Sequence, residues 1–154
     1  MKVSNRTDYA LRALFAMVAA RDGALLSSRQ LSEQNDIPKK FLEQILMELK
    51  AKGWVASVPG PKGGYRLAKP PGKITMGEVI RHFDGILAPI ACVSASGQKC
   101  CSQEAVCRFR RVFLQVRNRV AGIMDRADLE SVFRGDPVSK AEVLDLTFTE
   151  GGGI

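Results

Sequence analysis

Residues 38–67, which read PKKFLEQILMELKAKGWVASVPGPKGGYRL, decide the fold of this chain. The first half of this stretch, residues 38–53, predicts a helix with one buried face, because its apolar residues recur at i, i+3, i+4 and i+7. These residues are Leu42, Ile45, Leu46 and Leu49. The second half predicts a hairpin, in which strands 54–58 and 65–67 flank the basic turn PGPKGG.

Two further helices are predicted upstream. Residues 6–21 are rich in Ala and Leu and contain no Gly or Pro, which favours a long and largely buried helix. Ser27 and Gln30 match a capping box, which opens a short helix that ends near Gln34. Three helices with a short middle member are typical of a helix-turn-helix, and a basic hairpin after them indicates a winged helix. The predicted fold is therefore mainly α, with a small β-hairpin wing.

Helices are also predicted downstream of the hairpin. Thr75 and Glu78 form a second capping box, which predicts a helix that ends near Phe83. Residues 84–101 are irregular, a long helix is expected over residues 102–125, and a short one over residues 128–133. We accordingly divide the chain into a winged helix-turn-helix domain (1–75), a connecting helix with a cysteine-bearing loop (76–101), a long and a short helix (102–135) and a tail (136–154).

The long helix carries an apolar seam with spacings of 3, 4, 3, 4 and 3 residues. Its members are Val106, Phe109, Phe113, Val116, Val120 and Ile123. Such a/d spacing is typical of a helix that packs against another helix. A helix of 24 residues would be about 36 Å long, longer than a small domain needs internally. We therefore expect the seam to form a homodimer interface, with packing on the chain's own winged helix as the alternative.

Net charge is concentrated in the first half of the sequence. Residues 1–75 contain 13 Lys and Arg against 6 Asp and Glu, whereas residues 76–154 contain 10 of each. An excess of +7 on one half favours a polyanionic partner, of which nucleic acid is the commonest. The partner that we expect is a double-stranded DNA operator.

Composition and termini indicate a cytoplasmic protein without a membrane partner. Apolar residues make up 45% and charged residues 25% of the chain, as in ordinary globular proteins. The longest uncharged apolar run, 13–20, is shorter than the roughly 20 residues of a membrane span. The first ten residues lack the pattern of a signal peptide.

A DNA-reading surface is predicted on the third helix and the hairpin, because a recognition helix enters the major groove with its N-terminal residues at the base edges. Gln44 suits adenine and Glu43 suits cytosine, while lysines suit phosphate or guanine. Any one of these side chains could instead be a solvated surface residue. The predicted contacts are Ser28, Arg29, Lys39, Lys40, Phe41, Glu43, Gln44, Lys62, Gly63, Gly64 and Arg66.

All four cysteines fall within 16 residues. Cys92, Cys101 and Cys107 are spaced C-x8-C-x5-C, and Cys100 adjoins Cys101. Thiolates select zinc, copper(I) or iron–sulfur clusters, and the paired knuckles of a closed zinc site are absent from this spacing. Irregular spacing in a loop favours a cluster, with zinc and free thiols as the alternatives.

Four segments resemble the IscR/NsrR/RirA family of bacterial winged-helix repressors. They are TDYALRAL (7–14), FLEQIL (41–46), VASVPGPKGGYRLAKP (55–70) and ITMGEVI (74–80), and the resemblance spans residues 1–135. It implies a homodimeric transcriptional regulator, formed through the long helix, whose DNA affinity responds to iron, redox or nitric oxide status. The wing departs from the family at Pro59, where Arg commonly precedes the first glycine, which questions minor-groove reading by that position.

The resemblance also implies a metal site. Cys92, Cys101 and Cys107 would hold a [2Fe–2S] or [4Fe–4S] cluster. One branch of the family has a histidine three residues after the last cysteine, but Arg110 stands there in this chain. In the nitric-oxide-sensing branch the partner subunit supplies an aspartate from its first helix, and Asp8 matches that position, with Cys100 as the rival fourth ligand.

Two other functional classes are alternatives to a cluster-controlled regulator. A regulator of the same fold could sense redox state through metal-free thiols. A small metalloenzyme is disfavoured because the chain has one histidine and no catalytic triad, phosphate loop or paired acids in a glycine-rich context. We therefore expect no enzymatic activity.

Overall fold

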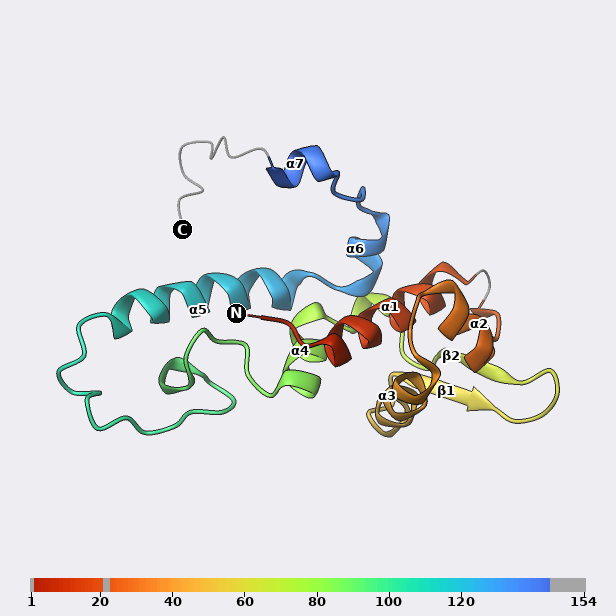
Figure 1. Ribbon diagram of the computed structural model, residues 1–154, viewed down its shortest axis with the longest axis horizontal. Coiled ribbons are helices and arrows are strands. Elements are labelled where there is room, and N and C mark those ends of the chain that lie inside the picture. Colours follow the sequence, from red (N-terminus) through yellow and green to blue (C-terminus); the bar gives the residue numbers. More distant parts are fainter. Residues whose placement is uncertain (1, 21–22, 145–154) are drawn as a thin grey trace.

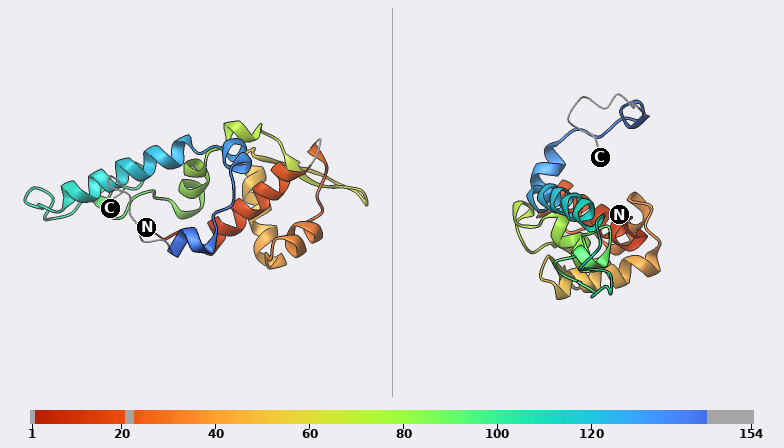
Figure 2. Two further views of the ribbon diagram at one scale, coloured as in Figure 1. Left: turned by 90° about the horizontal axis from the view of Figure 1, so that it is seen from above. Right: turned by 90° about the vertical axis from the view of Figure 1, so that its left-hand side faces the viewer.

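The computed structural model describes residues 2–20 and 23–144 and is mainly helical (Figure 1). The elements are α1 (Asn5–Ala19), α2 (Ser28–Gln34), α3 (Lys39–Ala51), β1 (Val55–Val58), β2 (Gly64–Leu67), η2 (Pro71–Lys73), α4 (Met76–Asp84), η3 (Ala91–Val93), α5 (Arg110–Arg126), α6 (Leu129–Arg134) and α7 (Lys140–Leu144). Residues 85–109, here called the cysteine loop, and the hairpin tip lie at opposite ends of the longest axis (Figure 1, Figure 2).

The core of the winged helix forms where α1, α3, α4 and the hairpin meet. The predicted stripe of α3 is buried in full: Leu42, Ile45, Leu46 and Leu49. Ala10, Ala13 and Leu14 of α1 pack against it, together with the buried Trp54 at the hairpin base. The expected helix-turn-helix with a wing is therefore confirmed.

Helix starts follow the predicted caps. Ser27 and Thr75 each form a capping box, with Gln30 and Glu78 respectively. The first helix begins one residue earlier than expected, because the Ser4 side chain accepts a hydrogen bond from the Thr7 backbone N–H. It ends at Ala19 rather than residue 21, which lies outside the described residues.

The wing is an antiparallel hairpin, and an isolated β-bridge joins it to the segment before α2. Its register pairs Val55 with Leu67 and Val58 with Gly64. Leu26 also bridges Tyr65, with reciprocal backbone bonds of 2.9 and 2.8 Å. A Cβ at Gly64 would lie 2.7 Å from the Leu26 carbonyl oxygen, so this close approach requires glycine. The attachment to Leu26 fixes the hairpin on the helix-turn-helix.

The segment after α5 returns to the winged helix through α6. Leu129 is fully buried in the core, and its N–H donates to the Ile74 carbonyl at 2.9 Å. The Met76 N–H donates to the Ala127 carbonyl at 2.8 Å. Because α6 follows α5 directly, these bonds anchor one end of α5 on the winged helix.

The long helix is shorter than predicted and starts eight residues later. It comprises 17 residues, so it is about 25 Å long rather than 36 Å. Val106 lies outside it and Phe109 only caps it. The physical reason lies in Arg110, which bonds both the Cys92 carbonyl and Glu104 and so folds residues 104–109 back on the loop.

Part of the apolar seam packs within the chain, and part of it is exposed to solvent. α5 packs against α4 and η3, which leaves Phe113, Val116 and Val120 half-buried. The outer edge of the helix remains uncovered, with Val112 58% and Ile123 52% exposed. The middle of the predicted seam thus packs within the chain, while its ends stay exposed, at Val106 and Phe109 before the helix and at Ile123 near its end. In the described part of the chain, no helix is long and apolar enough to cross a membrane.

Candidate functional site

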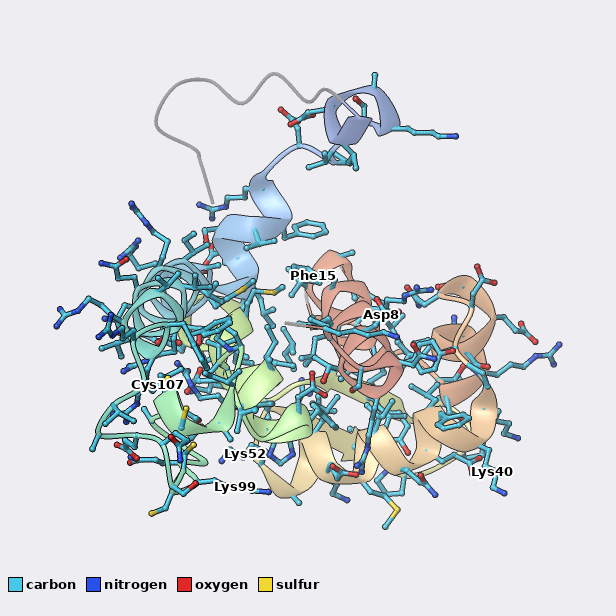
Figure 3. All side chains as sticks on the ribbon, turned by 60° about the vertical axis from the view of Figure 1, so that its left-hand side comes forward. Asp8, Phe15, Lys40, Lys52, Lys99 and Cys107 are labelled. Atoms are coloured by element: carbon cyan, nitrogen blue, oxygen red, sulfur yellow. The ribbon has the colours of Figure 1, made fainter. Side chains whose placement is uncertain are left out.

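One face of α3 is free for a partner. Lys39, Lys40, Phe41, Glu43 and Gln44 are all exposed, opposite the buried leucine stripe. Neither lysine forms an ion pair within the described residues, so the charge of both is available to phosphate. Figure 3 shows Lys40 at the outer edge of the molecule. The face thus has the geometry and charge of a recognition helix.

One exposed residue of this face is absent from the predicted DNA contacts. Met47 lies one turn after Glu43 and is 72% exposed. Its spacing from Gln44 and Glu43, three and four residues, places it on the same side of the helix. A flexible apolar side chain at this position suits contact with a thymine methyl group.

The other predicted DNA contacts are spread over α2 and the wing. Arg29 is exposed and pairs with Glu33 at 2.8 Å, while Ser28 is half-buried at the start of α2. Lys62 and Arg66 are exposed on the hairpin, beyond Pro59. A Cβ at Gly63 would lie 2.1 Å from the Val58 carbonyl oxygen, so the tight turn requires glycine there.

Three of the four cysteines line one cavity of about 470 Å³ at the start of α5. All three belong to the cysteine loop, with Cys92 in η3 and Cys101 and Cys107 after it. Cys92 and Cys107 are half-buried, whereas Cys101 is exposed, and all the cysteines are free thiols. Cys100 is exposed and is not among the residues that line the cavity.

These thiols do not form a site for a single metal ion. Among residues 2–20 and 23–144, no three side chains of Cys, His, Asp and Glu stand close enough to hold one. Zinc needs four ligands within about 2.0–2.3 Å of one point. Iron–sulfur clusters are held by cysteine thiolates, so the residue types that line this cavity are those that a cluster takes.

Asp8 lies apart from the cysteines of its own chain. It sits in the first turn of α1 and pairs with Arg12 at 2.7 Å, which is the ordinary place for an acidic residue near a helix N-terminus. Figure 3 shows it on the far side of α4 from Cys107. A ligand role for Asp8 therefore requires a second subunit.

Arg110 joins the two halves of the cysteine loop, and the sequence analysis assigned it no function. Its guanidinium donates to the Cys92 carbonyl at 3.0 Å and forms an ion pair with Glu104. The only signal in the sequence was its position three residues after Cys107. The arginine thereby holds Cys92 beside the segment that carries Cys107.

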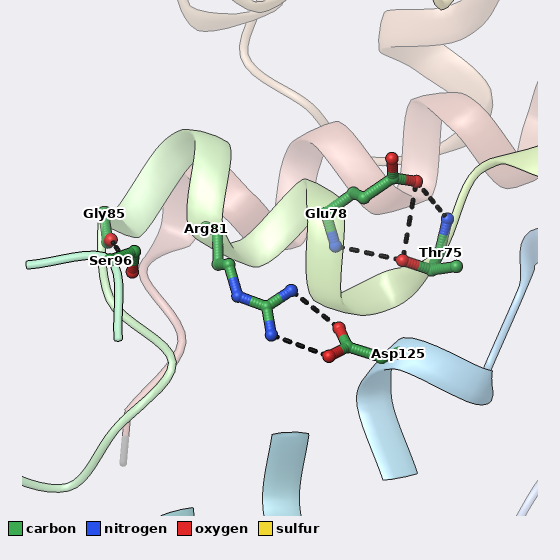
Figure 4. A network of polar contacts seen from close by, with 6 residues as sticks. All are labelled: Thr75, Glu78, Arg81, Gly85, Ser96 and Asp125. Atoms are coloured by element: carbon green, nitrogen blue, oxygen red, sulfur yellow. Dashed lines mark hydrogen bonds and ion pairs between the residues drawn. The ribbon is translucent and has the colours of Figure 1, made fainter. Parts of the chain in front are cut away.

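A bidentate ion pair connects α5 to the winged helix (Figure 4). The Arg81 guanidinium of α4 donates to both carboxylate oxygens of Asp125, at 2.6 and 2.8 Å. This hydrogen bonding lowers the pKa of Asp125 below its usual 3.8 and raises the pKa of Arg81. Since α4 also packs on α1, the ion pair connects α5 through α4 to the winged helix.

Comparison with known proteins agrees with this architecture. Residues 3–135 match the Rrf2 family, described as an iron-dependent transcriptional regulator. The chain is 37% identical to an rrf2-like HTH-type transcriptional regulator of Rhodobacter capsulatus, over 90% of this chain and 97% of the relative. It is 30% identical to the HTH-type transcriptional regulator NsrR of Bacillus subtilis, over 87% of this chain and 91% of the relative.

A solved structure shares the fold. CymR of B. subtilis, described as its global cysteine regulator, superposes with a TM-score of 0.73 at 25% identity. The match covers 86% of this chain and 96% of CymR.

Proposed function

Because this chain belongs to the Rrf2 family of transcriptional regulators, which are not enzymes, we propose that it is a DNA-binding repressor controlled by an iron–sulfur cluster. The observation that carries the proposal is the cavity that Cys92, Cys101 and Cys107 line together. The exposed, basic face of α3 at the other end of the molecule supports the DNA-binding half.

The DNA contacts divide into two groups. The α3 residues Lys39, Lys40, Glu43 and Gln44 read the major groove, and the exposed Lys62 and Arg66 of the wing bind the adjacent backbone. A pair of such helices reads two half-sites, which requires a homodimer. The uncovered edge of α5, with Val112 and Ile123, is the surface that we assign to the second copy.

The cysteine cavity is the control site. Cys92, Cys101 and Cys107 would hold the cluster, with Asp8 of the partner subunit or Cys100 as fourth ligand. When bound, a cluster would supply a centre that loss of iron, oxidation or nitric oxide degrades. Arg110 holds Cys92 in place, and the Arg81–Asp125 pair passes any change in α5 to α4. The signal thus changes the orientation of the two winged helices relative to each other, and this changes the affinity for DNA.

A metal-free thiol sensor is the second candidate. It is favoured by the likeness to CymR, described as a global cysteine regulator. Cys100 and Cys101 are both exposed and open to oxidants.

Absorbance of anaerobically purified protein separates the two candidates. A cluster gives charge-transfer bands in the near-ultraviolet and visible range, which Cys101→Ala should abolish and Cys100→Ala should retain. A more labile cluster in Asp8→Ala, with an intact dimer, would identify Asp8 as the fourth ligand. Fast bleaching in Cys100→Ala with a normal Asp8→Ala protein would assign that role to Cys100. Colourless wild-type protein whose DNA affinity still responds to a thiol oxidant would refute the cluster and support thiol sensing.

A further inference from the structure

A second cavity, of about 780 Å³, shares Cys92 and Cys107 with the cysteine cavity but is lined by four arginines. These are Arg108 of the cysteine loop and Arg110, Arg111 and Arg117 of α5, and we call this space the arginine cavity. Glu104 is the single carboxylate among its lining residues. The lining therefore carries an excess of three positive charges.

Only one of the four positive charges in the arginine cavity is neutralised by the described part of the chain. Glu104 pairs with Arg110, whereas Arg111 and Arg117 form no ion pair there. The Nε atoms of Arg110 and Arg117 are buried and have no hydrogen-bond partner. Buried unpaired donors are costly, and a guanidinium beside a carboxylate or phosphate removes that cost through charge-assisted bonds.

The helix that carries these arginines adds to the same field. α5 has 17 residues and begins at Arg110, with no side chain that caps its N-terminus and no acidic residue in its first turn. Its first backbone N–H groups and the positive end of its dipole thus lie beside Arg110 and Arg111. The spacing of Arg110, Leu114 and Arg117 places all three on one face of the helix, toward the cavity.

We propose that the arginine cavity binds a small polyanion that carries carboxylate or phosphate groups. Its volume lies within the range of small-molecule sites, about 300–1,000 Å³. Because Cys92 and Cys107 form part of its wall, the bound anion covers these thiols and limits their access to reagents. The site gives the regulator an input from an anionic metabolite besides the proposed cluster, and it does not require that cluster.

Calorimetric titration tests the binding site directly. Full-length, iron-free protein without DNA is titrated with citrate and, separately, with pyrophosphate at matched ionic strength. Saturable binding of citrate indicates a carboxylate ligand, and that of pyrophosphate a phosphate ligand. Loss of both arginines in Arg111→Gln/Arg117→Gln should weaken binding at least about tenfold, the expected loss for hydrogen bonds to charged groups.

The matched control is Arg119→Gln, which removes an exposed arginine of the same helix that does not line the cavity. It should bind as wild type. Absence of saturable binding of either probe, or equal weakening by Arg119→Gln, would overturn the proposal. Because iron and DNA are absent, such a failure would leave the cluster-controlled regulator untouched.

Thiol protection gives a second readout that misfolding of the arginine variant cannot mimic. Alkylation by iodoacetamide, a neutral reagent, is followed at each cysteine by peptide mass spectrometry. The bound anion should slow the modification of Cys92 and Cys107 in wild-type protein, while the exposed Cys100 serves as internal reference. Equal rates with and without anion at Cys92 and Cys107 would refute the site.

Discussion

Substitution of Gly77 in α4 should disrupt the contact between α4 and α5. A Cβ at Gly77, built on the backbone of α4, would lie 2.1 Å from Oδ1 of Asp125 and 3.1 Å from the Arg81 guanidinium. Since both neighbours are ends of flexible side chains, Gly77→Ala should fold but displace the Asp125 carboxylate. The variant therefore removes the Arg81–Asp125 pair without altering either charged residue.

Two opposing contributions of similar size determine how Gly77→Ala changes the free energy of unfolding. Alanine in place of glycine in a helix stabilises it by about 0.5–1 kcal/mol. The ion pair is partly exposed, with side chains 32% and 46% accessible, so its loss costs about 1 kcal/mol at most. We expect Gly77→Ala to be nearly neutral in the wild-type background. In an Asp125→Ala background, where no carboxylate obstructs the new methyl group, it should stabilise by about 0.5–1 kcal/mol.

Urea unfolding of the four proteins in this double-mutant cycle, at one protein concentration, measures the coupling energy. An equal gain from Gly77→Ala in both backgrounds would refute the close approach of Gly77 and Asp125. A functional consequence follows, because displacement of Asp125 loosens α5 from the winged helix. DNA affinity of Gly77→Ala should then respond less to the state of the cysteines than that of wild type.

The pH dependence of stability checks the same pair. Hydrogen bonding to Arg81 lowers the pKa of Asp125 below 3.8 in the folded protein. A lowered carboxyl pKa stabilises the folded state above the unfolded pKa, and this contribution is lost as pH falls through the folded pKa. The difference in unfolding free energy between wild type and Asp125→Ala should stay constant above pH ~5 and shrink only below it. A difference that disappears between pH 7 and 5 would contradict this assignment.

Two further predictions concern DNA binding and dimerisation. Replacement of Lys39 and Lys40 by alanine should weaken binding to duplex DNA and reduce the slope of log affinity against log salt by about 0.9 for each phosphate that is no longer neutralised. Lys99→Ala, in the cysteine loop away from α3, should leave the slope unchanged, and an unaltered slope in the double variant would remove these lysines from the interface. Aspartate at both Val112 and Ile123 should give monomers in sedimentation, because burying each charge in an apolar interface costs several kcal/mol. A persistent dimer would place the interface elsewhere.

Local patterns predicted most of the winged helix. The buried stripe of α3 follows directly from helical periodicity, since residues 42, 45, 46 and 49 share one face of any α-helix. The capping boxes at Ser27 and Thr75 depend only on residues three apart, and both formed as expected. Interactions within a few residues are encoded locally, so they can be read without knowledge of the rest of the fold.

The candidate site was predictable only in part. The spacing of the cysteines indicated a shared site, and three of them do line one cavity. The prediction from periodicity that the long helix begins at residue 102 was wrong: α5 begins at Arg110, whose side chain bonds across 18 residues to the Cys92 carbonyl. The attachment of the wing to Leu26 likewise joins segments far apart in the sequence.

The sequence by itself therefore determined the helix-turn-helix, the wing, the exposed charged face of α3 and the grouping of the cysteines, each of which rests on short-range pattern or composition. Only the tertiary structure decided where α5 begins, which edge of its apolar stripe stays uncovered, and that Asp125 meets Arg81 across 44 residues. It also gathered four arginines into one cavity. Periodicity states which residues share a face, but which neighbour covers that face depends on the packing of segments distant in the chain, and no local pattern carries that information.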